Sequence, residues 1–223
     1  MDRFTCGSPE YKAHMQEHAH ERGEREFLES VIQTGMTAVD AGGHFGLAAC
    51  AISRAIGGMG RLYCFEPIPE HREILRNNLE KNALRNVEIV PVALGKHAGK
   101  TRFYKDNDGT SIVPKPDRES TEADVVQLDS FFRERKLERL DLLNMDCEGS
   151  ELFVLQGAEE LLTANPISVF VEVHHELLKS LGQSVHDLLG FLRGLGYEVS
   201  TVSLSDLKRG EDWNTCEYLY ARR

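Results

Sequence analysis

The sequence lacks any long apolar run. No stretch approaches the roughly 18 consecutive apolar residues that a membrane-spanning helix needs. Residues 1–26 also hold no apolar segment of the kind found in a secretory signal. These two absences predict a protein that has no membrane partner and works in the cytoplasm.

The chain is also poor in positive charge and in paired cysteines. Lys and Arg total 26 against 36 Asp and Glu, giving a formal net charge of −10, and this surplus would repel the phosphate backbone of a nucleic acid. The five cysteines are scattered, and none forms a C-x-x-C pair. We therefore expect no nucleic-acid partner, no zinc cluster, and free thiols in a reducing compartment.

What the sequence does contain is an alternation of short apolar runs with helix-like segments. Its 223 residues, 41% hydrophobic and 28% charged, suit one α/β domain with modest additions. The order predicts a mostly parallel sheet with helices on both faces. The expected strands are 37–40, 61–65, 87–92, 101–104, 124–128, 140–145, 167–173, 197–203 and 217–222. The expected helices begin near residues 25, 45, 69, 150 and 184.

A glycine-rich turn, VDAGGHFG at residues 39–46, follows the first strand. Its spacing is not the G-x-G-x-x-G of dinucleotide-binding turns, and the acid Asp40 opposes a pyrophosphate but suits a sulfonium. Glu66 ends the second strand, where a carboxylate can accept both hydroxyls of a ribose. Taken singly, the two features could be an ordinary turn and a solvated or capping acid; together they favour an adenosine ligand without phosphates. The predicted cofactor-binding residues are Asp40, Gly42, Gly43, His44, Gly46, Glu66, Pro67 and Ala93.

Carboxylates crowd the loop after the strand at 140–145. Asp146, Glu148 and Glu151 lie within six residues of each other, and like charges this close are costly unless they bind something or cap a helix. His174, after the strand at 167–173, could accept a proton near neutral pH or could be a hydrogen-bonded structural residue. We predict that Asp146 is the general base or orients the acceptor hydroxyl, with Glu148 and His174 assisting. The carboxylates could also bind Mg²⁺, but we favour a site without metal.

Six segments, in order, resemble the FkbM family of S-adenosylmethionine-dependent methyltransferases: VDAGGHFG, CFEPIPEHREILRNNLEKN, NVEIVPVALG, VVQLDSFF, LDLLNMDCEGSELFVLQGAEELL and VFVEVH. The resemblance covers about residues 36–175. It implies a Rossmann-like fold with a seven-stranded sheet and an antiparallel last strand. It also implies S-adenosylmethionine as cofactor and O-methylation of a small-molecule acceptor, with sugars and polyketide-type natural products among family substrates. By position, the resemblance implies that Asp40, Gly42 and Gly46 form the cofactor loop and that Glu66 binds the ribose hydroxyls. It also implies that Ala93 lies by the adenine and that Asp146 and Glu148 face the methyl-transfer site.

The chain departs from the family pattern at two places. Gly43-His44 stands where the family usually has Ala-Asn, and a histidine can still donate a hydrogen bond. Asn144 stands where the family usually has Lys, and we expect it to contact the substrate. Without the positive charge of that lysine, either the pKa values of the nearby carboxylates are raised or there is room for another cation. Two alternatives stay open: a non-catalytic adenosine-binding or scaffold protein, and an NAD-dependent or nucleotide-sugar enzyme on the same fold.

We divide the chain into a polar N-terminal arm, residues 1–24, and one methyltransferase domain, residues 25–223, with a small insertion at residues 105–123. The arm is too polar to become ordered by burial alone. Its Tyr11 and His14 suit contact with an adenosine or an apolar acceptor, so we predict that the arm folds over the site when ligands bind. The alternative is a frayed terminus or a loosely packed helix.

Overall fold

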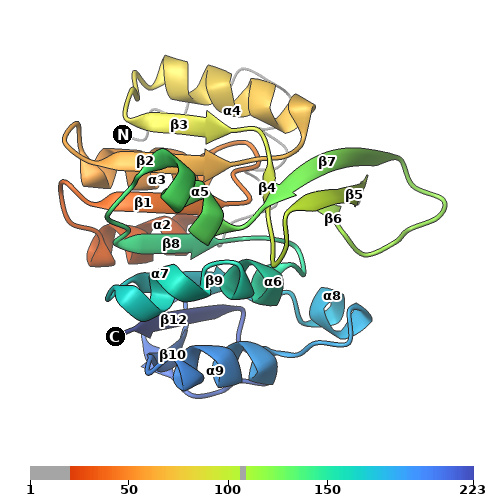
Figure 1. Cartoon of the computed structure of the whole chain (residues 1–223). Helices are drawn as coiled ribbons and strands as arrows, with labels where there is room; N and C mark the ends of the chain where they lie inside the picture. Colours follow the sequence, from red (N-terminus) through yellow and green to blue (C-terminus); the bar gives the residue numbers. More distant parts are fainter. Residues whose placement is uncertain (1–20, 106–108) are drawn as a thin grey trace.

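The computed structural model describes residues 21–105 and 109–223 of the chain (Figure 1). The strands are β1 (Thr37–Ala41), β2 (Arg61–Phe65), β3 (Val87–Val90), β4 (Ala93–Leu94), β5 (Gly99–Lys105), β6 (Thr110–Ser111), β7 (Ser120–Val126), β8 (Leu142–Met145), β9 (Ser168–Glu172), β10 (Glu198–Val202), β11 (Arg209–Gly210) and β12 (Tyr218–Arg222). The helices are α2 (Glu21–Val31), α3 (Leu47–Ile56), α4 (Pro69–Lys81), α5 (Leu128–Arg135), α6 (Glu151–Gln156), α7 (Glu159–Ala164), α8 (His175–Ser180) and α9 (Val185–Gly194).

The main sheet has the strand order β11-β10-β12-β9-β8-β1-β2-β3. Strands β9, β8, β1, β2 and β3 run parallel, so their carboxyl ends meet at one edge of the sheet. The last strand of the chain, β12, is antiparallel to both of its neighbours, β9 and β10. The predicted Rossmann-like sheet with an antiparallel last strand is therefore confirmed.

The sheet has one strand more than predicted. The extra strand, β11, is only two residues long and pairs antiparallel with β10 at the edge. It forms because the chain folds back after β10, where the Ser203 N–H donates to the Lys208 carbonyl at 2.9 Å. A two-residue pairing leaves no apolar periodicity, so the sequence pattern could not indicate it.

Helices cover both faces of the sheet, as predicted, and each face has its own apolar core. Side chains of α2, α3 and α4 pack on one face, and side chains of α5, α6, α7, α8 and α9 pack on the other. On the first face, Phe27 of α2 stacks on Phe170 of β9 with ring centroids 4.8 Å apart. On the second face, the rings of Phe131 in α5 and Phe65 in β2 meet edge to face, with their centroids 4.9 Å apart. Both cores hold the parallel strands in place and leave their carboxyl ends open.

A second, four-stranded sheet has the order β4-β7-β5-β6. It lies beyond the carboxyl ends of the parallel strands (Figure 1) and has a small apolar core made by Ile68, Ala93, Phe103 and Ala123. It includes the strands expected at 101–104 and 124–128, although the second of these ends at Val126. Leu128 instead begins α5, because Leu128, Phe131 and Phe132 have the i, i+3, i+4 spacing of a buried helix face.

Two expected helices have different bounds. The helix expected from residue 150 is divided at Gly157 and Ala158 into α6 and α7. Gly157 lies so close to Gly95 that a Cβ would be 2.1 Å from the Gly95 carbonyl oxygen, so a larger residue does not fit there. Asp129 then caps the second part by accepting the Glu160 and Leu161 N–H groups, each at 3.0 Å. The helix expected from residue 25 begins at Glu21, so the boundary that we drew at residue 24 falls inside α2.

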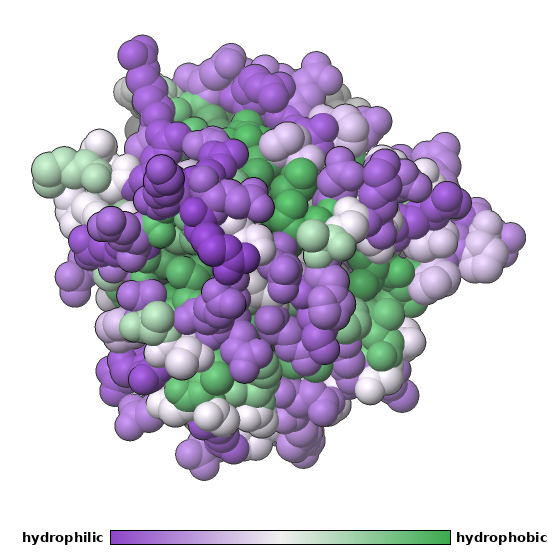
Figure 2. Space-filling model, in the orientation of Figure 1, coloured by the Kyte–Doolittle hydropathy of each residue, from purple (hydrophilic) through white to green (hydrophobic). Residues whose placement is uncertain are grey.

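Hydrophilic residues cover most of the face shown in Figure 2, with smaller apolar patches between them. In the part of the chain that the structure describes, no helix is long and apolar enough to cross a membrane.

Candidate active site

The turn after β1 lies directly against the end of β8. Gly42 has φ +95°, and a Cβ there would be 1.8 Å from the Asp146 carbonyl oxygen. Gly46 has φ +92°, and its Cβ would be 2.4 Å from Leu75 Cδ1 in α4. Both positions favour glycine because a positive φ strains other residues, and at Gly42 a Cβ would also overlap a backbone oxygen. This turn brings the predicted cofactor loop next to Asp146.

Asp40 lies below this turn, in the interior of the sheet. It is 1% exposed, and it accepts a hydrogen bond from Asn144 Nδ2 at 2.8 Å. Burial raises the pKa of Asp40 to about 6, against the opposing effect of the Asn144 and Cys64 hydrogen bonds. Asn144 is itself buried and is not among the described residues that line the cavity. Its position favours a role as a support for Asp40.

Glu66, after β2, organises the other side of the turn. The His44 N–H donates to its Oε2 and the Ile68 N–H to its Oε1, both at 2.7 Å. His71 Nδ1 of α4 lies 3.5 Å from Oε1. A carboxylate can accept about four hydrogen bonds, so Glu66 keeps acceptor capacity for a ligand's hydroxyls.

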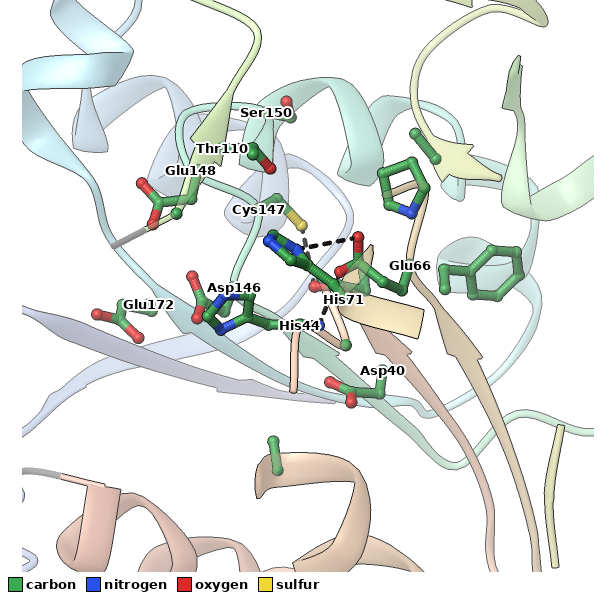
Figure 3. A pocket seen from close by; sticks show the side chains of 18 of the residues that line it. Asp40, His44, Glu66, His71, Thr110, Asp146, Cys147, Glu148, Ser150 and Glu172 are labelled. Carbon is green, nitrogen blue, oxygen red and sulfur yellow. Dashed lines mark hydrogen bonds and ion pairs between the residues drawn. The ribbon is translucent and has the colours of Figure 1, made fainter. Parts of the chain in front are cut away.

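A cluster of acids surrounds His174 where β8 and β9 end. The imidazole Nε2 lies 3.5 Å from Asp146 Oδ1, 3.7 Å from Glu148 Oε2 and 3.9 Å from Glu172 Oε1. In Figure 3, Asp146, Glu148 and Glu172 lie on one side of the cavity and Glu66 with His71 on the other. We call the first group, Asp146, Glu148 and Glu172 with His174, the acid side of the cavity.

Glu151 fixes the orientation of His174 from behind. It is 0% exposed, and its Oε1 lies 2.7 Å from His174 Nδ1 and accepts the Gly149 N–H at 3.1 Å. Burial alone would lower the pKa of His174, but the Glu151 hydrogen bond and the charges of Asp146 and Glu148 outweigh it and raise that pKa to about 10. At neutral pH the ring is therefore an imidazolium whose Nε2–H points among the acids.

Asp146 is the acid most affected by this environment. Its side chain is 41% exposed, yet Oδ1 is buried and has no hydrogen-bond partner among the described residues. Burial and the charge of Glu172 raise the pKa of Asp146 well above its usual range, and His174 only partly opposes them. A carboxyl group of this kind can exchange a proton near neutral pH.

One cavity joins the predicted cofactor residues to the predicted catalytic residues. It is lined by Asp40, Gly42, Gly43, His44, Gly46, Glu66, Pro67, Ala93, Asp146, Glu148 and His174, all of which the sequence singled out. Tyr11 and His14 of the arm lie outside the described residues. The second sheet adds Phe103 and Thr110 to the lining. The sequence pattern does not indicate His71 as a lining residue. It places Glu172 at the end of an apolar strand beside the site, but assigns it no role.

The cavity fits an adenosine ligand that carries positive charge. No lysine or arginine lines it within the described ranges, whereas a pyrophosphate would need donors or cations to bind it. Asp146, Glu148 and His174 also offer ligand atoms within 4.8 Å of one another. Because the His174 ring already holds a proton, a metal ion there would first have to displace it. The site without metal stays our prediction.

The fold is that of a Rossmann-like methyltransferase, and the sequence profile of the "Methyltransferase FkbM domain" matches residues 40–199. The chain belongs to the FkbM family of S-adenosylmethionine-dependent methyltransferases. S-adenosylmethionine is accordingly its cofactor. The predicted family and cofactor are thus confirmed.

Relatives and solved structures agree with this family. The chain is 28% identical over 156 residues to "Methyltransferase sdnD" of Sordaria araneosa, covering 55% of this chain and 60% of that one. It is 28% identical over 122 residues to "2-O-methyltransferase NoeI" of Sinorhizobium fredii, covering 46% and 49%. The crystal structure of methyltransferase FkbM from Methylobacillus flagellatus KT has a TM-score of 0.58 at 16% identity, covering 88% of this chain and 50% of that chain. The chain thus spans about half the length of these proteins.

Proposed function

We propose that this methyltransferase transfers the methyl group to a hydroxyl oxygen of a small molecule, a sugar or a polyketide-type natural product, and that Asp146 takes the hydroxyl proton. The observation that carries the proposal is the position of Asp146. It lies against the glycine turn, with a carboxyl group whose pKa is raised toward neutral. A base is most effective when its pKa is near the working pH.

In this mechanism the bound cofactor supplies an electrophilic methyl group on a sulfonium. The acid side orients the acceptor so that its oxygen lies in line with the methyl–sulfur bond, at about 3 Å. The acceptor oxygen would form the new bond to the methyl carbon and the thioether would leave with the electron pair of the carbon–sulfur bond, while Asp146 Oδ2 would take the hydroxyl proton, because Oδ1 is buried. Glu66 holds the ribose hydroxyls, and the His44 N–H keeps Glu66 in place at 2.7 Å.

His174 acts as a fixed positive charge. Because its pKa is raised to about 10, its ring holds a proton at neutral pH, and we propose that it assists Asp146 as a cation. Its Nε2–H keeps the neighbouring carboxylates from repelling one another while Asp146 gains and loses a proton. In this role His174 supplies the cation that Asn144 does not. The similarity to NoeI, which is named as a 2-O-methyltransferase, supports transfer to oxygen.

Replacing Asp146 tests the mechanism. We expect Asp146→Asn to reduce turnover about 100-fold or more, as is usual when a general base is lost, with little change in affinity for S-adenosylhomocysteine. The assay follows transfer of labelled methyl to pooled host metabolites, with mass spectrometry of the products. Asp124→Asn, at an exposed acid of β7, is the matched control. Unchanged turnover in Asp146→Asn would remove this residue from the mechanism.

Glu66 tests cofactor binding separately. Glu66→Ala should weaken S-adenosylhomocysteine binding by about 1.5–3 kcal/mol, the usual value for hydrogen bonds to a charged acceptor, as measured by calorimetry. Glu66→Gln keeps the size of the side chain and one of its two acceptor oxygens, so it should lose less. If both variants bind like the parent, Glu66 does not contact the ribose.

A further inference from the structure

The second sheet reaches the active site through β6 and the residue before it. Gly109 and Thr110 both line the cavity, on the side where Glu148 lies (Figure 3). The two neighbours of Thr110, Gly109 and Ser111, also contact Glu148, which follows Ser111 by 37 residues in the chain. The proposed mechanism gives these contacts no role.

Ser111 supports a strained backbone at Glu148. The φ of Glu148 is +49°, in the left-handed region, and the next residue, Gly149, has φ +97°. A residue with a side chain keeps such a conformation only where its surroundings hold it. The Ser111 hydroxyl donates to the Glu148 carbonyl oxygen at 2.8 Å and accepts the Val113 N–H at 3.1 Å. Because the Ser111 side chain is also buried, it holds this carbonyl in a fixed position.

Gly109 leaves the space in which the Glu148 side chain lies. A Cβ at Gly109 would be 2.7 Å from Glu148 Oε1 and 3.4 Å from its Cδ. Among the described residues beyond its chain neighbours, the three atoms nearest to this Cβ position all belong to Glu148. The other carboxylate oxygen, Oε2, lies 3.7 Å from His174 Nε2. The carboxylate therefore lies between Gly109 and His174, and any larger residue at position 109 would displace it.

We propose that Gly109 and Ser111 are positioning residues for methyl transfer. Ser111 holds the backbone of Glu148, and Gly109 leaves room for its carboxylate at the place from which it orients the acceptor. This inference rests on the proposed function, in which Glu148 belongs to the acid side of the cavity. Both residues act through Glu148, so the second sheet determines where one of the acceptor-orienting acids lies, independently of the cofactor turn.

Gly109→Ala displaces the carboxylate with little effect on folding. The φ of Gly109 is not in the left-handed region, and the atom nearest to the new Cβ is the end of a flexible side chain, which can turn away. We expect methyl transfer from labelled S-adenosylmethionine to metabolites of dilute host extract, where the rate reflects kcat/KM, to fall about 10-fold or more, because small misplacements of an orienting group are this costly. The Kd of S-adenosylhomocysteine and the melting temperature should equal the parent's. Gly58→Ala, at a glycine with open space around it, is the matched control. Loss of S-adenosylhomocysteine binding together with activity would show a general disturbance of the site and overturn the inference.

Glu148→Ala separates this inference from the proposed function. It removes the carboxylate but keeps the backbone carbonyl to which Ser111 donates. Gly109→Ala and Ser111→Ala should each lower the rate in the parent, and neither should lower it further in Glu148→Ala. A further loss in Glu148→Ala overturns the inference, and so does full activity of both single variants beside an impaired Glu148→Ala. Full activity of Glu148→Ala itself would instead remove Glu148 from the proposed function, and the inference with it.

Discussion

The contact between Glu151 and His174 allows the charge of the ring to be changed without changing its packing. In Glu151→Gln the side-chain carbonyl can still accept from His174 Nδ1–H and from the Gly149 N–H, the two donors that Glu151 Oε1 now serves. The negative charge is lost, and an NH2 group replaces Oε2, which has no hydrogen-bond partner among the described residues. The substitution therefore tests mainly the electrostatic part of the interaction.

The expected size follows from the difference between two kinds of hydrogen bond. A bond to a charged group contributes about 1.5–3 kcal/mol and one between neutral groups about 0.5–1.5 kcal/mol. Losing about 1–2 kcal/mol weakens proton binding by His174 roughly 5- to 30-fold, since 1.4 kcal/mol is a factor of ten. The ring should stay charged at pH 7, because its pKa begins at about 10. The methyl-transfer rate should then fall at a lower alkaline pH than in the parent.

The assay is an NMR titration of the protein labelled at histidine Cε1, with the His174 signal assigned by its loss in His174→Gln. Glu176→Gln is the matched control, because Glu176 is an exposed acid near His174 on α8, paired with Lys179 at 3.9 Å. The reasoning fails if His174 titrates at the same pH in Glu151→Gln as in the parent. It also fails if the control shifts the titration equally.

Three further predictions concern stability. Gly42→Ala should destabilise the protein by more than about 2 kcal/mol, because a Cβ at φ +95° would lie 1.8 Å from the Asp146 carbonyl oxygen. Gly190→Ala, at a position in α9 with open space around it, should stabilise the protein by about 0.5–1 kcal/mol. Denaturant melts that ranked the two variants the other way would contradict the turn geometry. Asp129→Ala should lose about 1 kcal/mol, the usual value of a helix cap, because it leaves the α7 N–H groups unpaired; a melting temperature equal to the parent's would rule this out. The ligand-free protein should become less stable as pH rises from about 4 to 10. Asp40 has a pKa of about 6 in the native state and 3.8 in the unfolded chain, and His174 has a pKa of about 10 against 6.5, so the native state keeps protons that the unfolded chain has already released. Thermal melts across this pH range would refute the prediction if stability rose instead.

The sequence was sufficient for the sheet and the cofactor turn because both depend on local patterns. Short apolar runs specify buried strands, and an acid followed by spaced glycines specifies a turn at a strand end. For this reason β2 has the predicted bounds, and Asp40 and Glu66 both line one cavity. Segments with weak periodicity were less predictable: β11 is a two-residue edge strand whose Arg209 also lies over the Tyr220 ring, and α7 begins where Asp129, 31 residues away, caps it.

The roles of individual polar residues could not be derived in the same way. Asn144 was expected to face the substrate, but its direction depends on the register of β8 against β1, which pairs Asn144 with Asp40. Glu151, the first residue of α6, is buried and contacts His174, 23 residues away. Such contacts join separate strand ends, and a single sequence shows neither the register nor the distance between them.

The second sheet has a consequence for how this enzyme could change over evolution. Its first strand, β4, and its last, β7, pair side by side, and the Gly95 N–H donates to the Val126 carbonyl at 3.0 Å. The chain therefore leaves the main body and returns to it at neighbouring points. A shorter or longer excursion between these points would leave the spacing of the main body unchanged, much as an exchangeable cassette would. Such exchanges could alter the wall that holds Phe103 and Thr110, and with it the choice of acceptor, while the glycine turn and Glu66 continue to hold the same cofactor.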